Sequence, residues 1–208
     1  MNRPQFFALI FVLFLAGLGG YFLLGSGDAD RSAPENSLGL AADPWQRAFE
    51  DEAGPSDSST AQATSGAQGE SGWVRFSDPR YGFSHDYPLA LRPSNVQDDE
   101  YGGEVFLFEG SGAEDGFQIF ISPFDEPLEV LTPERIREDA PDMLIESPQV
   151  VLVGQGEQFR ALIFFSEGES IGRTREAWFI HAGYLYQLTA PAARDAELAR
   201  VMGTWQFE

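Results

Sequence analysis

From Trp73 onward, short runs in which apolar and polar residues alternate are separated by turn residues. A period of two is typical of half-buried β-strands. We predict strands at 73–76, 81–87, 104–110, 117–124, 149–154 and 159–168, and a hairpin within 173–190 that turns near Ala182 and Gly183. We expect the core to contain six aromatic residues: Phe76, Phe106, Phe108, Phe120, Phe164 and Trp178.

Two segments have helical signals. At 132–140, Thr132 is a suitable N-cap, and Pro133 occupies the first helical position. At 191–205, an amphipathic pattern places Leu198, Val201 and Met202 on one face, and "WQF" follows as a final edge strand. Because hairpins follow one another without strand–helix–strand units, the pattern predicts an α+β domain with helices packed on an antiparallel sheet.

The N-terminal segment is apolar without alternation. Phe6–Leu24 is a 19-residue run with no charged side chain. At about 1.5 Å per residue, a helix of this length reaches roughly 28 Å, close to the thickness of a bilayer's hydrocarbon core. A cleaved signal peptide is the alternative, but its apolar region usually has only about 7 to 15 residues. We therefore expect residues 1–24 to form a retained membrane anchor.

The flanking charges predict the orientation of this anchor. Arg3 precedes the apolar run, whereas Asp28 and Asp30 follow it. The positive-inside rule then keeps the N-terminus in the cytoplasm and places the rest of the chain outside it. A chain without Cys suits an oxidising compartment. The expectation is a single-pass cell-membrane protein with an extracytoplasmic C-terminal domain.

Residues 25–72 are rich in Gly, Ser, Ala, Thr, Pro and acidic residues. Such a segment buries too little apolar surface to offset its ordering entropy, so we predict a flexible linker. Its length implies an end-to-end distance of roughly 35 to 40 Å. Trp45 and Phe49 lie four residues apart within it, on one face of a short helix if one forms. This turn could dock on the domain, bind a partner or have no fixed role.

Composition excludes several classes of function. The chain has 33 acidic and 13 basic residues, a net charge of −20, and its basic residues are all Arg. An acidic surface repels phosphate backbones, which excludes nucleic-acid binding. Without Lys there is no P-loop or Schiff-base chemistry, and without Cys there is no thiol nucleophile, disulfide or thiolate metal site. We expect no cofactor.

The stretch "RYGFSHDYP" contains the three residue types of a hydrolytic triad, Ser84, His85 and Asp86. On a strand, Ser84 and Asp86 share one face and His85 points to the other. Because a triad needs the imidazole between nucleophile and carboxylate, we predict no catalytic residue here. A metal site would require His85 and His181 to meet across the sheet. The default expectation for both histidines is a surface position.

An acidic loop offers oxygen ligands of the kind that Ca²⁺ prefers. The candidate metal-binding residues are Asp98, Asp99, Glu100 and Glu104. Glu114 and Asp115 follow nearby, but no EF-hand spacing is present. In a chain of this charge, a solvated acidic loop without a metal is the other interpretation.

The stretch "DPRYGFSHDYPLAL", together with "EAWFIHAGYLYQLTAPA" and a last helix ending in "GTWQF", resembles the PsbP-like domain family, named for the extrinsic photosystem II protein. Gly82-Phe83 and Tyr87-Pro88 match the Gly-Phe pair and the Tyr-Pro step of that family's second strand. The resemblance covers residues 73–208 and implies an antiparallel sheet sandwiched by helices, with a non-enzymatic accessory role in a larger complex. The anchor, the long linker and the lack of Lys distinguish this chain from the photosynthetic members and favour an anchored bacterial domain.

The expected organisation is an anchor at 1–24, a linker at 25–72 and a PsbP-like α+β domain at 73–208. The expected function is that of a non-enzymatic binding or scaffold domain, accessory to a complex in the cell envelope and bound to an unidentified protein partner. A capture or sensor module for a small ligand or Ca²⁺ is the first alternative. A hydrolase that uses scattered carboxylates is the second.

Overall fold

The computed structural model describes residue 45 and residues 72–98, 102–112, 115–168 and 171–208. The predicted anchor lies outside these residues, as does the predicted linker except for Trp45 and Gly72. Within the described part of the chain, no helix is both long and apolar enough to cross a membrane.

Among the described residues, ten strands form two sheets, in which the hydrogen-bonded neighbours are antiparallel. The smaller sheet has the order β1-β2-β10 and consists of β1 (Trp73–Asp78), β2 (Phe83–Pro88) and β10 (Gln206–Phe207). The larger sheet has the order β3-β4-β5-β9-β8-β7-β6. Its strands are β3 (Arg92–Asp98), β4 (Gly103–Glu109), β5 (Gly116–Pro123), β6 (Glu146–Val153), β7 (Phe159–Gly168), β8 (Gly172–His181) and β9 (Tyr184–Pro191).

The predicted strands and hairpins are confirmed, but two features differ from the expectation. The single predicted sheet is divided, because β2 packs its aromatic side chains on the larger sheet and pairs with β1 and β10 instead. Strand β3 was not predicted, since "RPSNVQD" has one apolar residue, Val96, and no alternation. The β8–β9 turn has positive φ at Ala182 and Gly183, 49° and 81°, as a tight hairpin requires.

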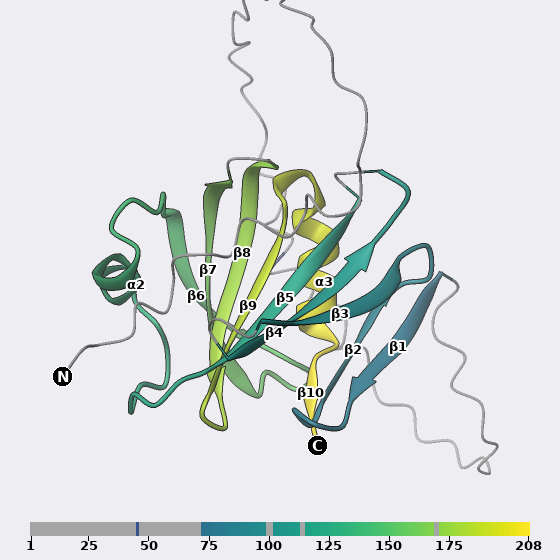
Figure 1. The fold of residues 1–208 in the computed structure, drawn as a ribbon, viewed down its shortest axis with the longest axis horizontal. Coiled ribbons are helices and arrows are strands. Elements are labelled where there is room, and N and C mark those ends of the chain that lie inside the picture. Colours follow the sequence, from purple (N-terminus) through teal and green to yellow (C-terminus); the bar gives the residue numbers. More distant parts are fainter. Residues whose placement is uncertain (1–44, 46–71, 99–101, 113–114, 169–170) are drawn as a thin grey trace, which may run out of the picture.

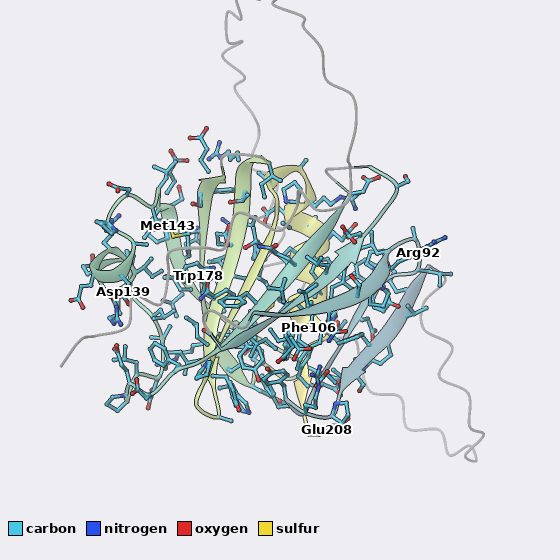
Figure 2. The ribbon with its side chains drawn as sticks, viewed as in Figure 1. Arg92, Phe106, Asp139, Met143, Trp178 and Glu208 are labelled. Atoms are coloured by element: carbon cyan, nitrogen blue, oxygen red, sulfur yellow. The ribbon has the colours of Figure 1, made fainter. Side chains whose placement is uncertain are left out.

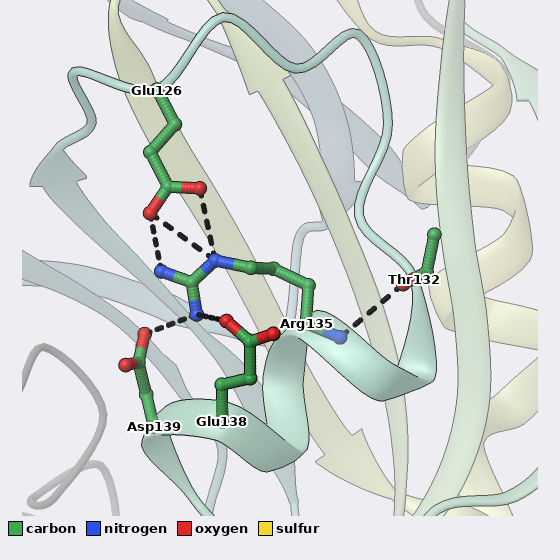
Figure 3. Close-up of polar contacts among 5 residues, drawn as sticks. All are labelled: Glu126, Thr132, Arg135, Glu138 and Asp139. Carbon is green, nitrogen blue, oxygen red and sulfur yellow. Dashed lines mark hydrogen bonds and ion pairs between the residues drawn. The ribbon is translucent and has the colours of Figure 1, made fainter.

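Helix α2 (Pro133–Asp139) has the predicted start, because the Thr132 side chain accepts a hydrogen bond from the backbone N–H of Arg135 at 3.2 Å. The Arg135 guanidinium donates to Glu126, before the helix, and to Asp139, one turn later (Figure 3). The N–O distances are 2.9 and 2.6 Å. This network fixes a helix of only two turns, whose single buried residue is Ile136.

The C-terminal helix is shorter than predicted. A 3₁₀ turn occupies Ala192–Arg194, and α3 runs over Asp195–Gly203. The predicted apolar face is buried as Leu198, Val201 and Met202. Figure 1 shows α2 beside β6 at one end of the larger sheet and the β1–β2 hairpin at the other.

The core lies on both faces of the larger sheet, since neighbouring residues of β7 belong to different clusters. Ile163 belongs to the cluster that includes α3 and the smaller sheet, and Phe164 to the cluster that includes Ile136 of α2. Phe106 and Met143, labelled in Figure 2, mark these two regions. Five of the six predicted core aromatics are buried, and Phe76 is half-buried against them. The result is a sheet-rich α+β domain.

Candidate functional site

The Ser84-His85-Asp86 stretch lies on β2 with the predicted alternation. Arg75, on β1, donates to the Ser84 hydroxyl at 2.9 Å and to the Asp86 carboxylate at 3.1 Å, so these two side chains share a face. His85 points the other way, into the core. The three side chains therefore do not form a triad, and Ser84 and Asp86 serve a structural contact with Arg75.

The expectation that His85 is a surface residue is wrong. Its ring is fully buried, and it stacks on Trp205, with ring centroids 5.0 Å apart, beside Phe83. Burial lowers the pKa of His85 to about 4, so the ring is neutral at pH 7. Phe83, His85 and Tyr87 alternate on one face of β2, and this aromatic pattern was the sequence signal for an inward-facing histidine.

His181 has a different environment. It ends β8 and stacks on Phe207 of β10, with ring centroids 3.5 Å apart. Partial burial lowers the pKa of its ring. Neither histidine belongs to a cluster of metal-ligating side chains, because the described residues contain no group of three or more such residues.

The pentapeptide Gly168–Gly172 reads Gly-Glu-Ser-Ile-Gly, the spacing of a hydrolase nucleophile elbow. That elbow requires a strand followed by a helix, whereas these residues connect the antiparallel strands β7 and β8. The serine itself, Ser170, lies outside the described residues. The local topology therefore does not match that of the catalytic motif.

Of the four calcium candidates, Asp98 and Glu104 lie in the described part of the chain. Glu104 is fully buried, and its Oε1 accepts hydrogen bonds from Arg80 at 2.7 Å and Asn95 at 2.5 Å. Arg80 also bonds Asp78 at 2.8 Å, so one guanidinium joins two carboxylates. Asp98 ends β3 opposite Gly103, and Asp99 and Glu100 lie outside the described residues. Glu104 acts here as a structural ion-pair partner.

A buried carboxylate that the sequence did not suggest lies at the centre of the larger sheet. Glu176 of β8 accepts hydrogen bonds from the hydroxyls of Thr174 and Thr189, each at 2.7 Å, and from the Trp178 indole at 3.1 Å. Burial raises the pKa of this carboxyl. Thr189 comes from β9, opposite Glu176. The pairing register of β8 and β9 is therefore needed to identify these four residues as a group. These three hydrogen bonds hold the Glu176 carboxyl inside the sheet, and we interpret it as a structural group.

Trp45, the described residue of the predicted linker before Gly72, contacts the domain. Trp45 is only 1% exposed and belongs to the core cluster that includes α3. Its Nε1–H donates to Oδ1 of Asp195, the first residue of α3, over 2.6 Å. Of the alternatives that the sequence left open for Trp45, docking on the domain is the one observed.

A cationic and an anionic side chain, Arg175 and Asp195, lie beside Trp45. The Arg175 guanidinium lies 5.4 Å from the Trp45 ring centroid and 4.3 Å from that of Phe165, within the range of cation–π contacts. Its Nε lies 2.9 Å from the Asp195 oxygen that accepts the indole N–H. We call Phe165, Arg175 and Asp195 the Trp45 site.

The Trp45 site is suited to an indole. Asp195 is the first residue of α3, where the helix dipole stabilises a negative charge. The nearly buried Arg175 holds its carboxylate in place through an ion pair. A carboxylate held in this way accepts a hydrogen bond from an indole N–H. A phenyl ring has no such donor and cannot form this bond. A site built around such a bond discriminates strongly against a ligand that lacks the donor.

No protein-family model matches this chain, and no curated protein matches it. Among solved structures, the chain is similar to the solution structure of cyanobacterial PsbP (CyanoP) from Synechocystis sp. PCC 6803, with a TM-score of 0.47 and 12% sequence identity. The match covers 70% of this chain and 98% of that chain. The likeness concerns the general arrangement of strands and helices alone.

Proposed function

We propose that this chain is a membrane-tethered, extracytoplasmic binding domain without enzymatic activity, which takes a tryptophan-bearing protein segment in the Trp45 site. The observation that carries the proposal is the burial of Trp45 against Arg175 and Asp195. In the resting protein the linker supplies the indole. An envelope partner with an exposed tryptophan displaces it.

The tether gives this competition a physical consequence. Residues 46–72 connect Trp45 to the start of the domain at Trp73. This connection gives Trp45 an effective concentration in the millimolar range at the Trp45 site. A partner must therefore bind more tightly than the linker does. With the anchor ending at Leu24, release of Trp45 lengthens the tether from about 25 Å to roughly 35 to 40 Å.

A labelled peptide of residues 40–52 tests the binding step by fluorescence anisotropy. The full-length protein in detergent is compared with its Trp45→Ala variant, whose Trp45 site is vacant. We expect saturable binding to the variant and much weaker binding to the unmodified protein, whose own Trp45 competes. A peptide with Phe in place of Trp45 is the matched control and should bind at least about tenfold more weakly.

Two results would count against the proposal. Equal binding to both proteins would mean that the peptide attaches elsewhere, and no binding to a folded Trp45→Ala variant would remove the site. Circular dichroism of the variant checks the fold. The location is tested separately by protease added to intact cells, where protection of the domain would contradict an extracytoplasmic placement.

A further inference from the structure

Strand β6 forms one edge of the larger sheet, with β7 as its partner among the described strands. An edge strand presents unpaired N–H and C=O groups that can pair with another strand. The register shifts between Glu146 and Gln149, and beyond the strand Gly154 donates to the Met202 carbonyl. The regular free edge is therefore Gln149–Val153.

The side chains of this edge are apolar on both faces. Val151 and Val153 point toward the core cluster of α3, whereas Val150 and Leu152 lie on the other face and are 53% and 45% exposed. No residue of Gln149–Val153 is charged. Charged side chains and Pro are the usual protection of an edge strand, and here Pro148 lies just before the free segment.

The opposite edge of the sheet is built differently. Strand β3 begins with Arg92 and Pro93 and ends with Asp98, and Val96 is its one apolar residue. Proline removes a donor from the edge, and the terminal charges oppose pairing with a second strand. The two edges thus differ in their protection, and β6 is the edge open to pairing.

Two ion pairs lie beside β6 in a chain whose net charge is −20. Arg173 lies 3.0 Å from Glu146, and Arg160 lies 3.9 Å from Glu129. These two ion pairs add no net charge at the edge itself, whereas α2, beside β6, carries three acidic and two basic residues. Long-range repulsion between two acidic chains remains, and it decreases as salt is added.

We propose that two copies of this chain associate by antiparallel pairing of their β6 strands along Gln149–Val153, so that the larger sheet continues from one copy to the other. A two-fold axis at Val151 places Val150 of each copy opposite Leu152 of the other, which shields both exposed side chains. The pairing is self-complementary, because both strands have the same apolar sequence. A contact of five residues per strand is small, so the affinity is expected to be low and to benefit from confinement in one membrane.

Cysteine cross-linking tests the register, because the chain has no Cys of its own. Val150→Cys and Leu152→Cys variants of the full chain, carrying different tags, are mixed in membranes and oxidised. We expect the mixed disulfide to form faster than either disulfide between identical variants. Val96→Cys, on the exposed side of β3, is the control and should cross-link slowly. Equal rates at all positions, or no cross-linking along β6, would overturn the proposal.

Charge complementation tests the same contact without oxidation. A Val150→Arg/Leu152→Arg variant and a Val150→Glu/Leu152→Glu variant should each self-associate at least about tenfold more weakly than the unmodified chain in sedimentation experiments, whereas their mixture should associate. Added NaCl should strengthen association of the unmodified chain. A chain that stays monomeric at every concentration and salt level, or a mixture no better than its components, would refute the pairing.

Discussion

The indole N–H of Trp45 donates to the Asp195 carboxylate across 150 positions of the sequence, over an N–O distance of 2.6 Å. The bond joins a segment that composition predicts to be a linker to the first turn of α3. It makes Trp45, which residues 46–72 separate from the first strand, part of the tertiary structure of the domain.

Replacement of Trp45 should lower the stability of the domain, and by more for Ala than for Phe. Trp45→Phe retains an aromatic ring but loses the N–H, and we expect a decrease of about 1–2 kcal/mol in the free energy of unfolding. Trp45→Ala also removes the buried ring, and we expect about 3 kcal/mol. Urea denaturation of the full chain measures both. A double-mutant cycle with Asp195→Asn should show coupling, and additive effects would mean that the bond contributes nothing.

Acidification should destabilise the domain through His85. Its pKa of about 4 in the folded state lies below the ordinary value of 6.5, so between these values the unfolded chain binds more protons. Stability is therefore lost as the pH falls through this range, by about 3 kcal/mol for this group. His85→Phe should remove most of this slope in urea denaturation followed against pH.

The matched control for His85 is the other histidine. His181 is only partly buried, so His181→Gln should retain most of the acid sensitivity of the unmodified protein. If His85→Phe and the unmodified protein lose stability in parallel between pH 6.5 and 4, the buried imidazole is not the group that titrates.

The alternation of residues predicted the strands, and the aromatic residues Phe83 and Tyr87 beside His85 were a local signal for the buried face of β2, although the prediction put His85 at the surface. That alternation separates His85 from Ser84 and Asp86 correctly, because a strand has a period of two in any environment. The position of β2 against Phe106 and Trp205 depends on the docking of the smaller sheet on the larger one, which no local pattern encodes.

Long-range contacts account for the site residues that the sequence did not indicate. Glu176 lies between Thr174 and Trp178 on one face of β8, a local clue, but Thr189 joins them only through the register with β9. Trp45 lies in a polar segment, and its bond to Asp195 depends on the complete tertiary fold. Glu104 belongs to an acidic cluster in sequence, whereas the structure pairs it with Arg80.

Removal of Arg80 should be costly because it leaves the buried carboxylate of Glu104 without its cation. We expect Arg80→Met to lower the free energy of unfolding by about 2–4 kcal/mol, below the upper range for fully buried pairs because Arg80 is half-exposed. Arg80→Met/Glu104→Gln should recover part of this loss, since no uncompensated charge remains. A double variant less stable than Arg80→Met would contradict this explanation, and thermal unfolding would reveal it.

Replacement of Glu176 by its neutral isostere should stabilise the domain at neutral and higher pH relative to the unmodified protein. Burial raises the pKa of the Glu176 carboxyl above its ordinary value near 4.5. The folded state therefore binds this proton more tightly than the unfolded chain does. The stabilisation that results is complete below the unfolded pKa and is lost as the pH rises through the folded pKa.

Glu176→Gln carries no charge to desolvate and can still accept hydrogen bonds from Thr189 and Trp178. The difference in unfolding free energy between the variant and the unmodified protein should consequently move in the variant's favour from pH 4.5 to pH 8. Glu167→Gln, on an exposed position of β7, is the control and should show no such trend. A constant difference at all pH values would instead mean that the two threonine hydroxyls and the indole stabilise an ionised Glu176 as well as water does.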